Sequence, residues 1–139
     1  MTIKTIIAAI GFATTATFAM AAAHGMAPAV EAMDQDVSGG TVVATKIVSP
    51  ADGWLVVHRT DADMKPGPVI GHAMVKEGEN MDVTAELSEA VASGDMLMLM
   101  LHGEDGGMMA GEFEYTLGAK EDGPVRVDDN LVMIVVTAQ

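Results

Sequence analysis

The chain has 139 residues, a formal net charge of −13 at pH 7 and no cysteine. A surface this acidic repels phosphate backbones and anionic lipids, which argues against nucleic acid and membrane surfaces as partners. Without cysteine the protein has no disulfide, no thiolate zinc site and no blue-copper centre, since the last needs a Cys ligand.

Residues 1–23 have the layout of a secretory signal peptide. Lys4 is a minimal positive start, residues 6–20 are an apolar run, and small residues end the segment. Glycine and threonine interrupt the run, which falls short of the roughly 20 strongly apolar residues of a membrane span. We predict cleavage after Ala21 or Ala23, and a periplasmic or secreted protein that is not inserted in the membrane.

Residues 24–40 are rich in alanine, glycine and acidic side chains and end in Ser38-Gly39-Gly40. This composition predicts a flexible N-terminal arm. The folded domain is then expected over residues 41–139. A segment of that length suffices for one domain with its own core and leaves no room for a second.

Short strand-like runs alternate with turn residues along the predicted domain. They cover residues 41–49, 54–60, 69–75, 80–87, 96–102, 112–117, 125–127 and 131–138. Residues 88–95 could form one helical turn capped by Ser88. The regular spacing predicts an all-β fold, a single antiparallel Ig-like or cupredoxin-like sandwich of about seven or eight strands.

Hydrophobic patterns differ between these runs. Residues 80–87 alternate apolar and polar side chains, which predicts a half-buried strand with Met81 on its inner face. Residues 96–102 are apolar until the final histidine, which predicts a strand covered on both faces. In residues 112–117 the alternation predicts that Phe113 and Tyr115 face inward.

Several short motifs carry a resemblance to a known family. They are GWLVVHR, KPGPVIGH, LMLHGEDG, GEFEY and EDGPVRV. They resemble a family of uncharacterised exported β-sandwich domains found in haloarchaeal surface proteins and some bacteria, over residues 41–136. The resemblance includes His58, His102 and the acid-glycine turn 104–107. It implies the sandwich fold and export but no catalytic residues, and the abundance of methionine departs from the family pattern.

Methionine is abundant, with 13 in the chain. Thioether sulfur is a soft ligand that prefers Cu(I) and forms no disulfides in an oxidising compartment. Methionine also replaces leucine in cores, and Met81 and Met133 lie in strand patterns that predict such burial. The methionines within residues 96–102 share one strand face, which is either core or a ladder of thioethers that ends at His102.

The main candidate copper site combines histidine with methionine. Met108 and Met109 lie in a glycine-flanked loop six and seven residues after His102. A hairpin here could gather these three side chains into a trigonal Cu(I) set, the alternative being a merely hydrophobic loop. His58 could approach His102 if their strands are neighbours, with Met100 contributing a thioether. A hydrogen-bonded structural role is the alternative for His58.

A second candidate site lies in the arm. Cleavage after Ala23 would make His24 the amino terminus, whose amine and imidazole can chelate Cu(II) as a histidine brace. Cleavage after Ala21 would give Ala-Ala-His, which binds Cu(II) in a square plane. Met26 adds a ligand for Cu(I), although a histidine after a signal peptide can also be coincidence.

We predict an exported Met/His-rich β-sandwich that binds copper for sequestration or handover, with a copper donor or acceptor protein as partner. The alternative is a non-catalytic structural or interaction module of unknown ligand with an acidic, salt-adapted surface. Calcium is less expected because no acidic loop matches the EF-hand pattern. No enzymatic activity is expected, because the sequence contains no nucleophile elbow, HExxH motif or phosphate loop.

Overall fold

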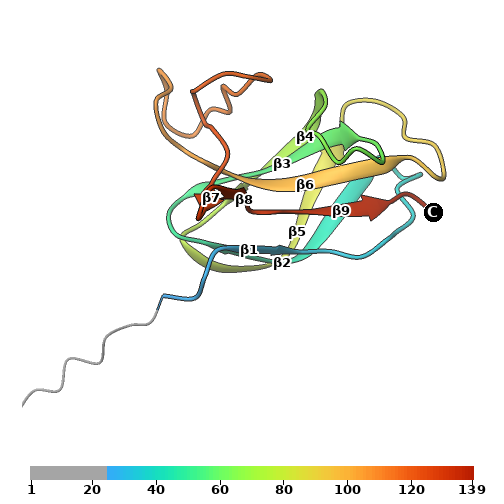
Figure 1. Ribbon diagram of the computed structural model, residues 1–139, viewed down its shortest axis with the longest axis horizontal. Helices are drawn as coiled ribbons and strands as arrows, with labels where there is room; N and C mark the ends of the chain where they lie inside the picture. Colours follow the sequence, from blue (N-terminus) through green and yellow to red (C-terminus); the bar gives the residue numbers. More distant parts are fainter. Residues whose placement is uncertain (1–24) are drawn as a thin grey trace, which may run out of the picture.

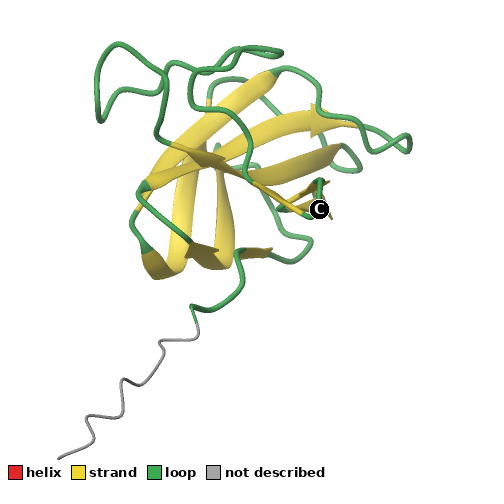
Figure 2. Cartoon of the chain, turned by 60° about the vertical axis from the view of Figure 1, so that its left-hand side comes forward, coloured by secondary structure: helices red, strands yellow, loops and turns green. Residues whose placement is uncertain are grey.

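The computed structural model describes residues 25–139, and within this range it contains only strands, turns and loops (Figure 2). The strands are β1 (Ala29–Glu31), β2 (Thr41–Ser49), β3 (Gly53–Thr60), β4 (Val69–Val75), β5 (Gly78–Leu87), β6 (Met96–Gly103), β7 (Arg126–Val127), β8 (Asn130–Leu131) and β9 (Met133–Thr137). The prediction of an all-β domain is therefore confirmed. No helix that could span a membrane occurs in the described range.

Seven strands form one antiparallel sheet in the order β1-β2-β5-β4-β3-β6-β9, and β7 pairs with β8 in a separate hairpin. The sheet curls until its two edge strands, β1 and β9, lie side by side (Figure 1). A parallel bridge between Gln35 and Ala138 joins the edges. The result is a nearly closed, barrel-like sheet, consistent with the sandwich-like architecture expected from the strand spacing.

Gln35 closes this seam with both its backbone and its side chain. Its backbone carbonyl accepts a hydrogen bond from Gln139 N–H at 2.9 Å, on the side of β9. On the side of β2, its Nε2 donates to the Val43 carbonyl at 2.9 Å and its Oε1 accepts from Val43 N–H at 2.8 Å. The side-chain amide thus replaces a backbone ladder pair where the two edges meet.

The predicted flexible arm is wrong for residues 29–37, which belong to the folded domain. Strand β1 pairs with β2, and the side chains of Val30 and Val37 are buried in the core. A three-residue strand is too short to show a hydrophobic period, and the alanines and glycines around it are typical of linkers. The domain boundary therefore lies earlier than residue 41.

Strands β3 and β6 lie next to each other, and each is buried on both faces. Their inner face contributes Leu55, Val57, Leu97, Leu99 and Leu101 to the main core. Their other face carries Trp54, Val56, His58, Met98, Met100 and His102, all of which are buried. The continuous apolarity of β6 is explained by this double coverage, as the sequence pattern predicts.

Other local predictions are corrected by the structure. Residues 112–117 form a loop instead of a strand, and residues 88–95 contain bends and turns but no helical turn. Met81 is 59% exposed rather than buried. The reason lies in Asp82, which directly follows Met81: its φ of 51° is left-handed and breaks the alternation of β5 between Met81 and Val83.

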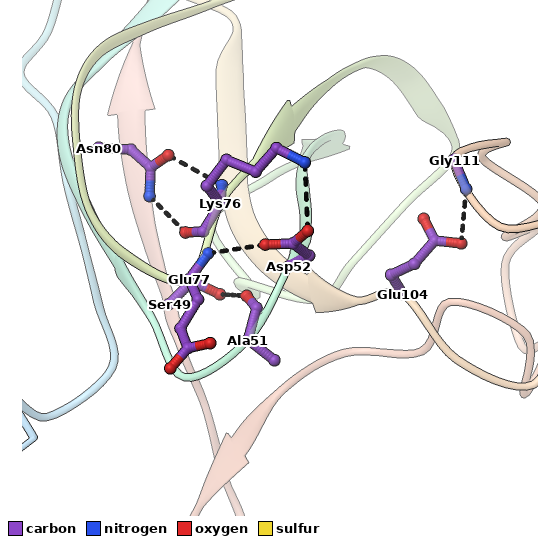
Figure 3. Close-up of polar contacts among 8 residues, drawn as sticks. All are labelled: Ser49, Ala51, Asp52, Lys76, Glu77, Asn80, Glu104 and Gly111. Atoms are coloured by element: carbon purple, nitrogen blue, oxygen red, sulfur yellow. Dashed lines mark hydrogen bonds and ion pairs between the residues drawn. The ribbon is translucent and has the colours of Figure 1, made fainter.

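Two turns at one end of the sheet are tied together by Asp52 (Figure 3). Its Oδ1 accepts a hydrogen bond from Glu77 N–H at 3.0 Å, and its Oδ2 lies 3.1 Å from Lys76 Nζ. Because Asp52 precedes β3 and Lys76 follows β4, these contacts fix the turn ends of the two strands relative to one another.

Candidate metal site between two buried histidines

His58 on β3 and His102 on β6 converge on the outer face of this strand pair. In the ladder, His58 lies opposite Met98 and His102 lies opposite Trp54. The two imidazoles lean towards each other, and their Nε2 atoms are 3.4 Å apart. Neither side chain is exposed to solvent. The sequence predicts that the two histidines approach each other only if their strands are neighbours. The strands are neighbours, and the histidines meet.

The hydrogen bonds of the other ring nitrogens fix the tautomers. Nδ1 of His58 is 2.8 Å from the Gly67 carbonyl oxygen, and Nδ1 of His102 is 2.6 Å from the Asp122 carbonyl oxygen. A carbonyl can only accept, so each Nδ1 must carry the proton and donate it. Each neutral ring then presents an unprotonated Nε2, and the two lone pairs face each other.

The rings are arranged nearly end to end. Their centroids are 5.6 Å apart with an interplanar angle of 29°. This separation is close to the Nε2 to Nε2 distance plus the radius of each ring, so the line between the centroids passes near both Nε2 atoms. The lone pairs consequently point at a common position midway between the histidines.

Burial keeps both histidines neutral. It lowers the pKa of His102 to about 4; the Asp122 carbonyl and the Asp122 charge oppose this effect, and the neighbouring His58 adds to it. Burial also lowers the pKa of His58, opposed by the Gly67 carbonyl. At pH 7 no proton is therefore expected between the nitrogens, and two buried acceptors face each other without a donor.

A long loop, residues 104–124, covers the histidine pair. It runs from the end of β6 towards β7 (Figure 1) and contributes the Tyr115 ring. This ring meets His102 edge to face at a centroid distance of 4.5 Å and His58 at 5.9 Å. The same loop supplies the Asp122 carbonyl, so it both shields and orients the pair.

Internal hydrogen bonds hold the covering loop in shape. Oε1 of Glu104 accepts from Gly111 N–H at 3.1 Å (Figure 3). The buried side chain of Asp122 accepts from Glu114 N–H through Oδ2 at 2.8 Å, and Asp122 N–H donates to the Asp105 carbonyl at 2.9 Å. These bonds link both ends of the loop near the point where it meets His102.

Two methionines lie on the same face as the histidines and are fully buried. Met98 lies directly opposite His58, and Met100 lies opposite Val56. Because alternate residues share a face, Met100 occupies the register position between His58 and His102. A buried thioether is thus placed beside the pair by the ladder itself.

The other predicted ligands are not gathered at this site. The Met108 side chain is 94% exposed and that of Met109 is 59% exposed, whereas His102 is buried. The predicted hairpin that joins His102 to both methionines is therefore not formed, because the loop turns Met108 into solvent. Met26 is also exposed, in the segment before β1, and His24 lies outside the described residues.

Sequence reasoning missed three groups that position the histidines. They are the Tyr115 ring and the backbone carbonyls of Gly67 and Asp122. A backbone carbonyl carries no residue-specific signal, and both carbonyls belong to loops whose course depends on the fold. The GEFEY motif did single out Tyr115, but its alternation suggested a strand instead of a covering loop.

Comparison with curated proteins finds no match, and neither does comparison with solved structures. The family model described as Domain of unknown function (DUF7282) matches residues 28–139. This range includes all the strands of the described structure and both buried histidines. The chain therefore belongs to the DUF7282 family, a domain family of unknown function.

Proposed function

We propose that the protein binds one Cu(I) ion between Nε2 of His58 and Nε2 of His102. The observation that carries this proposal is the facing pair of unprotonated nitrogens, each on a ring whose Nδ1 donates to a backbone carbonyl. Metal-binding histidines are commonly held in this way, because the second hydrogen bond fixes the tautomer and the orientation of the ring. A cation between the rings would satisfy both lone pairs.

The ligand set favours Cu(I) over other metals. Within residues 25–139 no three His, Cys, Asp or Glu side chains are grouped to hold a metal, so a tetrahedral zinc site or an oxygen-rich calcium site has no support. Cu(I) accepts two imidazoles in a linear arrangement, and it also accepts thioethers. The thioethers of Met98 and Met100 lie on the same face of β3 and β6 as the two histidines. The tautomers favour a cation between the rings, and the small ligand set and the soft thioethers favour Cu(I) as that cation.

The spacing needs only a small adjustment. With metal to nitrogen distances of about 2.0 Å, a linear ion requires Nε2 atoms about 4 Å apart. The observed separation is 3.4 Å. A slight outward rotation of the two rings would make room for the ion. A small bend at the metal towards Met100 would reduce the required separation further.

We propose in addition that the protein acts outside the cytoplasm, without catalytic activity, to sequester copper or hand it to a donor or acceptor protein. The layout of residues 1–23 supports export, and the absence of cysteine suits an oxidising compartment. The exposed thioethers of Met108 and Met109 could hold Cu(I) during an exchange with such a partner.

An anaerobic titration against a chromogenic Cu(I) chelator tests the site. We expect the protein to withdraw one equivalent of Cu(I), and His58→Gln and His102→Gln each to abolish this. His72→Gln is the matched control, since this histidine lies on the neighbouring strand β4 and should leave binding intact. Thermal unfolding of each variant shows whether it is folded.

Two outcomes would overturn the proposal. One is undiminished capture by a folded His102→Gln variant. The other is capture that persists in both histidine variants and disappears in Met108→Leu/Met109→Leu, which would move the site to the exposed loop.

A further inference from the structure

A groove lies next to the histidine pair, on the far side of Tyr115. Its walls are the start of β4, the end of β5 and the loop residues 113–117. Its volume is about 720 Å³. Small-molecule sites typically occupy roughly 300–1,000 Å³ and combine an apolar lining with few polar groups.

One wall of the groove is a packed aromatic cluster. The Phe113 ring stacks on His72 at a centroid distance of 4.3 Å and an interplanar angle of 24°. Trp54 supports both rings from behind, at 5.6 Å from His72 and 5.4 Å from Phe113. Tyr115 adds a second aromatic surface to the lining. Rings held this firmly offer a flat face to an apolar or cationic ligand.

Glu86 is the one acidic or basic side chain other than His72 that lines the groove. None of the ion pairs in the described part of the chain involves Glu86. His72 lies opposite it in the ladder, but burial lowers the pKa of His72, so that histidine is neutral at pH 7. The groove therefore holds one carboxylate without a protein cation to balance it.

We propose that this groove binds a small organic amine, with its apolar body against Phe113 and Tyr115 and its ammonium group paired with Glu86. The ammonium complements the carboxylate, and the ring faces attract both the cation and the body. The net charge of −13 also favours a cation over an anion of the same shape. This inference does not rest on copper binding.

The test uses the full chain, free of metal, and three probes of nearly equal shape. They are 4-phenylbutylamine, the neutral 4-phenylbutan-1-ol and the anionic 5-phenylpentanoate. Trp54 is the single tryptophan and touches two lining residues, so its fluorescence reports on binding. We expect a saturable change with the amine, about tenfold weaker binding of the alcohol, and none of the anion.

Two variants locate the interaction. Glu86→Gln should weaken amine binding about tenfold and leave the alcohol unchanged. Glu79→Gln is the matched control, because it removes the same charge from the same strand at a residue that pairs with Lys46 outside the groove. Equal binding of amine and alcohol, no saturable binding of the amine, or equal effects of the two variants would each overturn the proposal.

Discussion

Nε2 of His58 faces Nε2 of His102 across 3.4 Å, while Nδ1 of each ring donates to a backbone carbonyl. Two buried acceptors in this position repel each other and have lost their water. The arrangement persists because strands β3 and β6 fix the register and two separate loops supply the carbonyls. In the function that we propose, a Cu(I) ion would relieve this repulsion by binding both Nε2 lone pairs.

The tautomers can be measured directly. Long-range ¹H–¹⁵N spectra of the metal-free protein at pH 7 should show His58 and His102 both protonated at Nδ1, with Nε2 in the unprotonated range. Addition of one equivalent of Ag(I), a closed-shell substitute for Cu(I), should shift both Nε2 resonances and not those of His72. A proton on Nε2 of either buried histidine would contradict the geometry.

Acid should destabilise the metal-free protein over a defined window. The pKa of His102 is about 4 in the folded state against 6.5 for an ordinary histidine, so the unfolded chain takes up its proton first as the pH falls. The stability associated with the neutral ring is complete above pH 6.5 and is lost progressively down to pH 4. Over this window the difference in the pKa of His102 lowers the free energy of unfolding by about 3 kcal/mol.

Urea unfolding at a series of pH values checks this expectation. His102→Gln is the control, because the carboxylates and the buried His58 titrate in both proteins and only the wild type has the imidazole of His102. The free energy of unfolding should fall more steeply with acid in the wild type. Parallel curves for the two proteins would show that His102 is not held neutral by burial.

Much of the fold could be predicted because several strands have strong local signals. The runs that became β2 and β4 are rich in β-branched residues and end at turn residues, and their predicted bounds match the structure. Strand β1 and the loop carrying Phe113 and Tyr115 were misassigned. Both are decided by tertiary packing, at a seam and over a sheet face, which local patterns do not report.

The site could be predicted only in part. The sequence singled out His58 and His102, but their approach depends on the pairing of β3 with β6, which are far apart in the chain. It also favoured Met108 because two large apolar side chains in a glycine-rich loop suggested a shared site. Position in a loop does not set side-chain direction, and the structure exposes this residue.

Met100 should contribute to copper affinity more than Met98. Both are buried, but only Met100 occupies the register position between the two histidines. Met→Leu exchanges conserve volume, so each variant should retain stability to within about 1.5 kcal/mol. We expect Met100→Leu to weaken Cu(I) binding roughly tenfold, in the range found when groups that support a metal ligand are lost. Competition with the chelator measures the Cu(I) affinity of Met98→Leu and Met100→Leu. If Met100→Leu binds Cu(I) as tightly as Met98→Leu, the Met100 thioether is not a ligand.

Gly53 should be intolerant of any side chain. A Cβ at this position would overlap the backbone carbonyl oxygen of His102 on the adjacent strand. Gly53→Ala must therefore push β3 and β6 apart, at a cost of roughly 1–3 kcal/mol. Gly39→Ala is the matched control, since nothing lies within 4 Å of its Cβ. Chemical denaturation compares them, and equal stability would mean that the strands are not packed this closely.

Asp122 is expected to act through its conformation and hydrogen bonds more than through its charge. Its φ of 45° suits Asp and Asn but strains Ala, and its buried Oδ1 has no hydrogen-bond partner in the described structure. Asp122→Asn should keep the bond from Glu114 N–H and stay within about 1 kcal/mol of wild-type stability, whereas Asp122→Ala loses about 1–3 kcal/mol.

The same pair of variants tests how His102 is positioned. If the turn at Asp122 holds the carbonyl that binds Nδ1 of His102, Asp122→Ala should weaken Cu(I) binding and Asp122→Asn should not. Chelator competition alongside urea unfolding separates the two effects, because a merely structural role would lower stability and leave the affinity of the folded fraction unchanged. A weakened Cu(I) affinity in Asp122→Ala, rescued by asparagine, would link the conformation of the covering loop to the chemistry of the buried histidines.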